Sequence, residues 1–100
     1  MILEVADIRI KPGSQSAFDV AIKQGLDTVI SKAKGYRGHK VQKGIESPDR
    51  YLLMIYWDTV ENHTVDFRGS ADFAEWRKLV GHCFAAPPEV EHVHEVVKGF

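Results

Sequence analysis

The chain has 100 residues, of which 13 are basic and 14 acidic, and its formal net charge is −1. No more than two basic residues stand in a row. This argues against a nucleic-acid partner, because nucleic-acid binding needs a concentrated basic surface. The longest uncharged apolar run, at residues 51–57, is far shorter than the ~20 residues that span a bilayer. We therefore expect no membrane partner.

Cysteine usage and the N-terminal residues indicate where the protein resides. The single cysteine, Cys83, rules out an intrachain disulfide and fits a reducing compartment. The N-terminal residues lack the basic and apolar regions of a secretion signal. We therefore expect one unprocessed domain, spanning residues 1–100, in the cytoplasm.

The N-terminal third predicts a strand and a helix. Residues 2–10 alternate in polarity as a strand does, and the Lys-Pro-Gly segment at 11–13 ends it. Ser14 is the expected N-cap of a helix, and Gly35 is its expected C-cap. The apolar stripe of this helix recurs at three- and four-residue spacings: Phe18, Ala21, Ile22, Gly25, Leu26, Val29 and Ile30.

The middle of the chain predicts a hairpin and a short helix. Residues 36–46 and 50–57 favour extended structure, and the Ser-Pro-Asp segment between them favours a turn. The two strands should therefore pair as a hairpin. Thr59 is the expected cap of a short helix that runs to Phe67, where Arg-Gly interrupts it.

The last third predicts a second amphipathic helix and a final strand. Ser70 should cap the helix, and its apolar residues are Phe73, Trp76, Val80 and Cys83. Ala-Ala-Pro-Pro at 85–88 ends it, and residues 90–97 predict a strand. The order of elements is that of an α+β, ferredoxin-like βαββαβ fold with an antiparallel four-stranded sheet.

The strand at 50–57 predicts a homodimer. Its seven bulky residues Tyr-Leu-Leu-Met-Ile-Tyr-Trp carry no charge, and alternate side chains of a strand point to opposite faces. Both faces of this strand therefore need cover. A chain of 100 residues has helices enough for one face. A second copy packed against the other face would give a dimeric α+β barrel.

Several motifs carry a family resemblance. Tyr-Leu-Leu-Met-Ile-Tyr-Trp at 51–57 is followed by Asp-Thr-Val-Glu-Asn-His at 58–63, then Phe-Arg-Gly-Ser at 67–70, Phe73 and Trp76-Arg77. An aromatic-rich strand that ends in Trp, a short helix and a Ser-led second helix resemble the antibiotic biosynthesis monooxygenase domain family. The segment Pro-Pro-Glu-Val-Glu-His at 87–92 is similar to one subgroup.

The resemblance implies a homodimeric barrel that oxidises an aromatic, phenolic or quinone-like compound with molecular oxygen. It implies neither a metal nor an organic cofactor. Such chemistry needs a base that ionises the substrate. His63, on the inward side of the short helix, has a residue type that titrates near neutral pH. We expect His63 to be catalytic, although it could instead only pack and hydrogen-bond a strand end.

Aromatic residues are the candidates for the walls of a substrate pocket, because large rings suit a flat ligand. The set, completed by one histidine of the last strand, is Tyr51, Trp57, Phe67, Trp76 and His92. Core packing is the competing interpretation for each ring. His92 and His94 share one strand face, as metal ligands often do, but no further ligand is evident.

Other functions remain open at this stage. The haem-degrading branch of the family uses an Asn on the first strand, where this chain has Ala6 and Asp7. Its Trp and His positions fall near Val65 and Arg77, so all three depart. The main alternative to a monooxygenase is a non-catalytic dimeric barrel that binds a small hydrophobic molecule or takes part in a stress response. A pocket filled by its own side chains is another.

Overall fold

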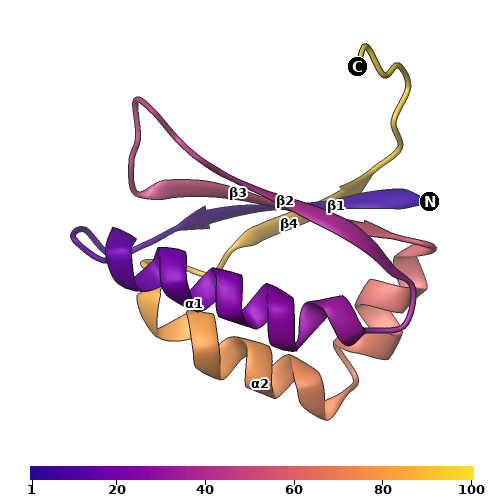
Figure 1. Ribbon diagram of the computed structural model, residues 1–100, viewed down its shortest axis with the longest axis horizontal. Helices are drawn as coiled ribbons and strands as arrows, with labels where there is room; N and C mark the ends of the chain where they lie inside the picture. Colours follow the sequence, from indigo (N-terminus) through magenta and orange to yellow (C-terminus); the bar gives the residue numbers. More distant parts are fainter.

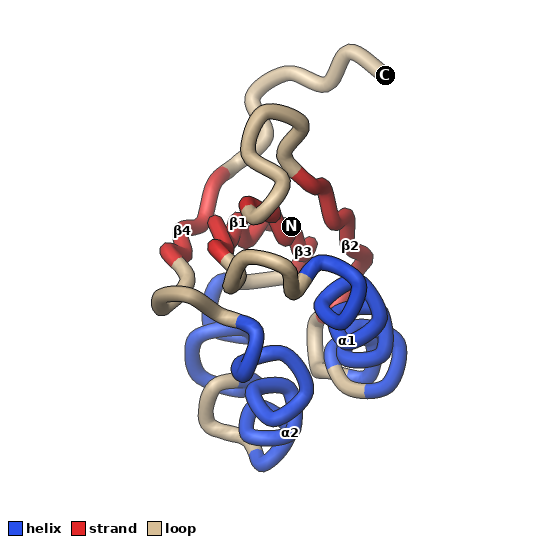
Figure 2. Tube along the Cα trace, turned by 90° about the vertical axis from the view of Figure 1, so that its left-hand side faces the viewer, coloured by secondary structure: helices blue, strands red, loops and turns tan.

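The computed structural model describes all 100 residues. A four-stranded antiparallel sheet carries two long helices and a short π-helical turn, η2, on one face (Figures 1 and 2). The elements are β1 (Ile2–Arg9), α1 (Gln15–Thr28), β2 (Tyr36–Lys43), β3 (Arg50–Trp57), η2 (Asn62–Phe67), α2 (Ala71–Val80) and β4 (Glu89–Val93). The strand order β2-β3-β1-β4 confirms the predicted ferredoxin-like fold. None of the helices is long and apolar enough to cross a membrane.

The core lies between the helices and the inner face of the sheet. Burial alternates strictly along β1 and β3, as a pleated strand with one covered face requires. The inner residues of β3 meet Phe18, Ile22 and Leu26 of α1, which are also buried. Fully burying a side chain of this size contributes about 1.5–3 kcal/mol. This face therefore provides most of the stability of the fold.

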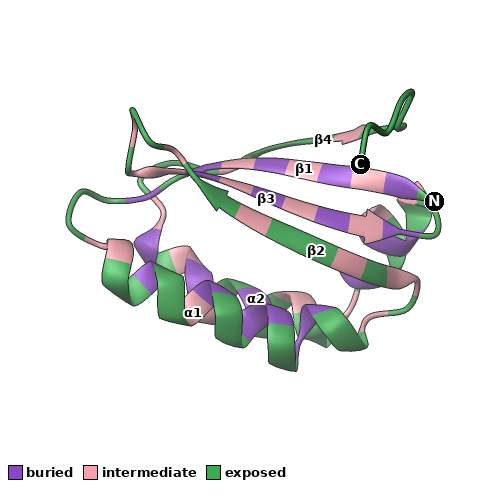
Figure 3. Ribbon diagram, turned by 45° about the horizontal axis from the view of Figure 1, so that its top comes forward, coloured by how far each residue is buried: buried purple, intermediate pink, exposed green.

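The outer face of the sheet is uncovered. The central strands place Leu3, Val5, Leu52, Met54 and Tyr56 on this face, where each is only half-buried. Figure 3 shows the alternation as bands along β1 and β3. One chain thus covers one face of its apolar central strand and leaves the other open.

The first helix ends earlier than predicted. α1 stops at Thr28, and a separate 3-10 turn follows at Ile30–Lys32. β-branched residues favour helices poorly, and the Thr28 hydroxyl donates to the Gln24 carbonyl at 2.7 Å. Gly35 therefore does not cap α1. It has φ +84° in the turn that enters β2.

Of the three side chains predicted to cap helix N-termini, only one makes the expected hydrogen bond. The Thr59 hydroxyl accepts a hydrogen bond from the backbone amide of Asn62 at 3.2 Å, as the side chain of an N-cap does. Ser14 and Ser70 precede their helices, but neither hydroxyl caps a helix amide. Ser70 instead donates to the Phe67 carbonyl at 2.6 Å.

Two strands are shorter than predicted. β2 ends at Lys43, because the Gly44 amide bonds the Arg50 carbonyl and begins the hairpin loop. β4 ends at Val93, whose partner across the ladder is Leu3. Beyond this pair β1 has almost no residues left to accept a strand, so residues 94–100 leave the sheet (Figure 1).

The contact between α1 and α2 gives a test of the packing. A Cβ atom at Gly25 would lie 2.7 Å from the Trp76 ring, whereas one at Gly81 meets nothing within 4 Å. We expect Gly25→Ala to lower the free energy of unfolding by about 1–3 kcal/mol, because overpacking outweighs the gain in helix propensity. Urea titration of both variants measures this. Gly81→Ala is the control and should be neutral or slightly stabilising, and equal effects at the two positions would contradict the packing.

Candidate functional site

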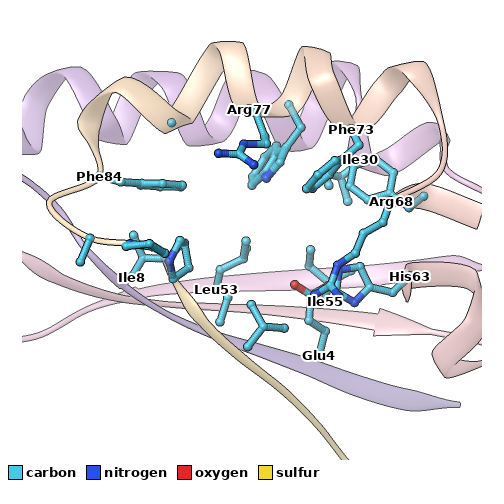
Figure 4. A pocket seen from close by; sticks show the side chains of 18 of the residues that line it. Glu4, Ile8, Ile30, Leu53, Ile55, His63, Arg68, Phe73, Arg77 and Phe84 are labelled. Carbon is cyan, nitrogen blue, oxygen red and sulfur yellow. The ribbon is translucent and has the colours of Figure 1, made fainter. Parts of the chain in front are cut away.

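A cavity of about 520 Å³ opens between the inner face of the sheet and α2. Its floor includes Ile8, Leu53 and Ile55, and its roof includes Phe73 (Figure 4). Trp76 of α2 also lines the cavity. Twelve of its 19 lining residues are hydrophobic. Mostly apolar walls with a few polar groups are typical of sites that bind small organic molecules.

A buried acid, Glu4, lies at one end of this cavity. β1 turns alternate residues inward, and Glu4 takes an inward position between Ile2 and Ala6. The Trp57 indole N–H donates to Glu4 Oε1 at 2.9 Å. Burial raises the pKa of Glu4 to about 7, although this hydrogen bond and the Arg68 charge lower it in part. Near neutral pH this carboxyl can therefore both hold and accept a proton.

His63 lies beside this acid, as the helical spacing predicted for its inward side. Its Nε2 atom is 3.4 Å from Glu4 Oε1, and its ring stacks on Trp57 with centroids 5.5 Å apart. Its other nitrogen, Nδ1, hydrogen-bonds His92 Nε2 at 2.8 Å. Burial lowers the pKa of His63 to about 4, and the nearby Arg68 and His92 act in the same direction. His63 is thus neutral at physiological pH.

The π-helical turn η2 holds His63 in place. Asn62 is buried and accepts hydrogen bonds from the amide and hydroxyl of Thr59, while its own amide donates to Asp66. A Cβ atom at Gly35 would overlap Asn62. Only glycine therefore allows the turn before β2 to approach η2 this closely. The wide π turn is a form often found at functional sites.

The structure brings most of the predicted site residues to one end of the sheet. His63, Phe67 and Trp76 line the cavity. Trp57 lies behind His63 and Glu4, with its ring fully buried. His92 is half-buried behind His63 and reaches it through the hydrogen bond between their rings.

Tyr51 is not part of this cavity. Its hydroxyl donates to Asp19, and its ring packs edge-on against Phe18 with centroids 4.7 Å apart. Tyr51 shares the inner face of β3 with Trp57 but stands at the opposite end of that strand. There α1 covers it completely, so it belongs to the core.

Sequence reasoning missed three polar residues of the cavity. Glu4 occupies a position whose neighbours on the same face are apolar, and that mismatch was the available signal. Arg68 stands at the predicted break between the two helices and is exposed there, but it was not among the predicted site residues. Its backbone amide does close η2 by bonding the His63 carbonyl, and its side chain also lines the cavity. Arg77 lines the cavity from α2, and the sequence pointed to it only through the family motif and not as a site residue.

The acid and the two histidines do not converge on a common point. His63 faces Glu4 with one ring nitrogen and His92 with the other. No group of three or more His, Cys, Asp or Glu side chains is arranged to hold a metal ion. His94 lies beyond the end of β4.

Comparisons with known proteins identify a matching family and similar proteins. A family model described as antibiotic biosynthesis monooxygenase matches residues 1–79. The uncharacterised protein YczJ of Bacillus subtilis is 38% identical over 96 residues, which cover 96% of this chain and all of YczJ. A crystal structure from Bordetella bronchiseptica, which bears the family's name, is 47% identical with a TM-score of 0.92. The match covers 96% of this chain and 97% of that one.

More distant structures share the fold. One is a mutant of SnoaB from Streptomyces nogalater, described as a cofactor-independent oxygenase. It has a TM-score of 0.81 at 9% identity, over 98% of this chain and 95% of that one. The family model and the close relatives extend over most of the sequence, including the strand that carries Glu4 and the turn that carries His63. This chain belongs to the antibiotic biosynthesis monooxygenase family.

Proposed function

We propose that this protein is a monooxygenase that removes a proton from a small phenolic or quinone-like aromatic compound and lets the resulting anion react with molecular oxygen. The observation that carries the proposal is the buried Glu4 carboxyl in contact with neutral His63 at the end of an apolar cavity. A base whose pKa lies near the working pH is the most effective one. Glu4, with a pKa of about 7, meets this condition.

Glu4 and His63 act as one base in this proposal. The catalytic role predicted for His63 alone is shared with the acid, because burial lowers the pKa of His63 to about 4. Glu4 accepts the substrate proton, and His63 holds the carboxyl in position through its Nε2 atom, 3.4 Å away. Arg68, which lines the same end of the cavity, favours the negative charge that forms on the substrate oxygen.

The reaction consumes one molecule of oxygen. The base takes a proton from an activated CH₂ group or a phenol, and the carbanion transfers electrons to O₂ and forms a C–O bond. The peroxide takes up a proton and then loses water. A ring CH₂ group and O₂ thus become a ketone and H₂O, with the carbon oxidised and the oxygen reduced. The apolar walls, which include Phe67 and Trp76, suit a flat substrate of this class.

His92 fixes the tautomer of His63 in this proposal. Nε2 of His92 donates to His63 Nδ1, 2.8 Å away, so the single proton of the neutral His63 ring lies on Nε2 and faces the Glu4 carboxylate. His63 stays neutral in this arrangement, which its buried position favours.

The names of the relatives support an oxygenase. The close Bordetella bronchiseptica structure bears the name of the monooxygenase family, and SnoaB is described as a cofactor-independent oxygenase. A binding protein without catalysis would not need a titratable acid in contact with a histidine. The contact between Glu4 and His63 therefore favours the enzyme over the binder.

A homodimer is the second part of the proposal. The open apolar face centred on Leu52, Met54 and Tyr56 would be covered by the same face of a second copy. Such a self-complementary interface is the commonest kind. The terminal residues Val96, Val97 and Phe100 are exposed apolar side chains, and a second copy would give them a surface to pack on.

Oxygen uptake with a panel of phenols, quinols and anthrones tests the activity. We expect turnover by the wild type and a loss of about 10²–10⁴-fold in Glu4→Gln and His63→Gln, because each removes half of the base. The wild-type rate should rise with pH up to about 7, where Glu4 becomes ionised, and level off above it. His39→Gln, at an exposed position on β2, is the control. Full turnover in either site variant would remove the assignment.

The pH dependence of stability tests the Glu4–His63 pair without a substrate. The raised pKa of Glu4 makes stability fall as pH rises from 4.5 to about 7. The lowered pKa of His63 makes stability rise from pH of about 4 to 6.5. Each effect changes the free energy of unfolding by about 3 kcal/mol at most, and the two effects oppose each other in the wild type.

Single substitutions should reveal the separate effects of Glu4 and His63 on the pH dependence of stability. Relative to wild type, Glu4→Gln should lose stability as pH falls from 6.5 toward 4, and His63→Gln should lose it as pH rises from 4.5 toward 7. Urea midpoints measured across this range provide the comparison. Three parallel curves would show that the two groups titrate normally.

Sedimentation velocity tests the dimer. Met54→Lys puts a charge in the centre of the open face and should convert the dimer to a monomer, because an unpaired charge in an apolar interface is costly. Val20→Lys is the matched control, since Val20 is an exposed apolar residue on α1. A monomeric wild type, or a dimer unaffected by Met54→Lys, would contradict the proposal.

A further inference from the structure

The five arginines of the chain fall into two groups. The three away from the cavity are each paired with an aspartate: Arg37 with Asp58 at 2.6 Å, Arg50 with Asp7 at 2.9 Å, and Arg9 with Asp7 at 3.7 Å. The two that line the cavity, Arg68 and Arg77, are paired with no carboxylate of the chain. Unpaired guanidinium groups thus occur only at the cavity.

Both unpaired arginines point into the cavity from the helical side. Figure 4 shows Arg68 reaching down to Glu4 and His63, while Arg77 enters between Phe84 and Phe73. The Arg77 guanidinium carbon lies 5.9 Å from the centre of the Phe73 ring. Contact with an aromatic ring holds a guanidinium in one orientation. Arg77 is an exposed residue and presents its donors at the solvent-facing side of the cavity.

The cavity offers the two arginines only one carboxyl, and that carboxyl is only partly ionised near neutral pH. Glu4 is the only carboxyl among its lining residues, and burial keeps this group largely protonated below pH 7. His63 is neutral. Arg68 and Arg77 are exposed residues that line the cavity, and a guanidinium without a carboxylate partner favours a ligand that brings its own negative charge.

We propose that the cavity binds an aromatic carboxylate, with the carboxylate on Arg77 and the ionisable ring hydroxyl at the end formed by Glu4 and Arg68. The planar fork of a guanidinium matches a carboxylate with two parallel hydrogen bonds. The apolar floor of Ile8, Leu53 and Ile55 then lies under the ring. This inference rests on the proposed function, whose substrate class it narrows to hydroxylated aromatic acids.

Calorimetry with a matched pair of ligands tests the charge requirement. 6-Hydroxy-2-naphthoate carries a hydroxyl and a carboxylate at opposite ends of a flat ring system, and 6-hydroxy-2-naphthamide differs only in lacking the charge. We expect the acid to bind the wild type about tenfold or more tightly than the amide. Equal affinities, or no binding of either compound, would overturn the inference.

Variants assign the carboxylate to one arginine. Arg77→Gln should reduce the preference for the acid to about threefold or less, and Arg77→Lys should restore part of it. Arg68→Gln should weaken acid and amide alike, because it acts at the hydroxyl end. Arg37→Gln, which alters an exposed arginine outside the cavity, should leave the preference unchanged. Loss of the preference in Arg68→Gln but not in Arg77→Gln would refute the placement.

Binding and oxygen uptake separate this inference from the proposed function. If the acid binds preferentially but no phenol or hydroxylated acid consumes oxygen, the carboxylate site stands and the monooxygenase proposal fails. If oxygen is consumed with neutral phenols and the acid shows no advantage in binding, the monooxygenase stands and the carboxylate site fails.

Discussion

The hydrogen bond from the Trp57 indole to Glu4 is the interaction on which the site depends. Trp57 is the largest fully buried side chain, and a buried indole N–H needs an acceptor. Glu4 supplies that acceptor at 2.9 Å from the neighbouring strand. The acid is thereby held in a buried position, and burial raises its pKa. His63 then stacks on the same indole, so one core aromatic residue positions both titratable groups.

The inner face of β3 is covered differently at its two ends. Tyr51 and Trp57 both face inward, but they meet different partners. Tyr51 is covered by Phe18 of α1 and bonded to Asp19, which hold it in the core. Trp57 is met by η2, a short turn that covers less of the sheet than a long helix does. The cavity begins beside this narrower cover and extends along β1 from Glu4 to Ile8.

Local patterns in the sequence were sufficient for the fold and for part of the site. The helical spacing placed His63 on the inward side, and the uncharged run in β3 indicated that both sheet faces need cover. The environment of Glu4 could not be predicted, because it depends on Trp57, which lies 53 residues away along the chain. The early end of β4 at Val93 likewise follows from the length of its partner strand. Periodicity along one segment contains no information on either contact.

The π-helical form of η2 ties the site to the length of the chain as well as to its residue types. A π turn accommodates one residue more than an α turn, and each residue of an α-helix advances the direction of its side chain by about 100°. Deletion of a single residue upstream of His63 within this turn would restore an α-helix and rotate the imidazole away from Glu4. A sequence comparison that scores residue types alone would still find a histidine there. The number of residues in the turn, rather than their types alone, thus decides whether the Glu4 carboxyl and the His63 imidazole are in contact.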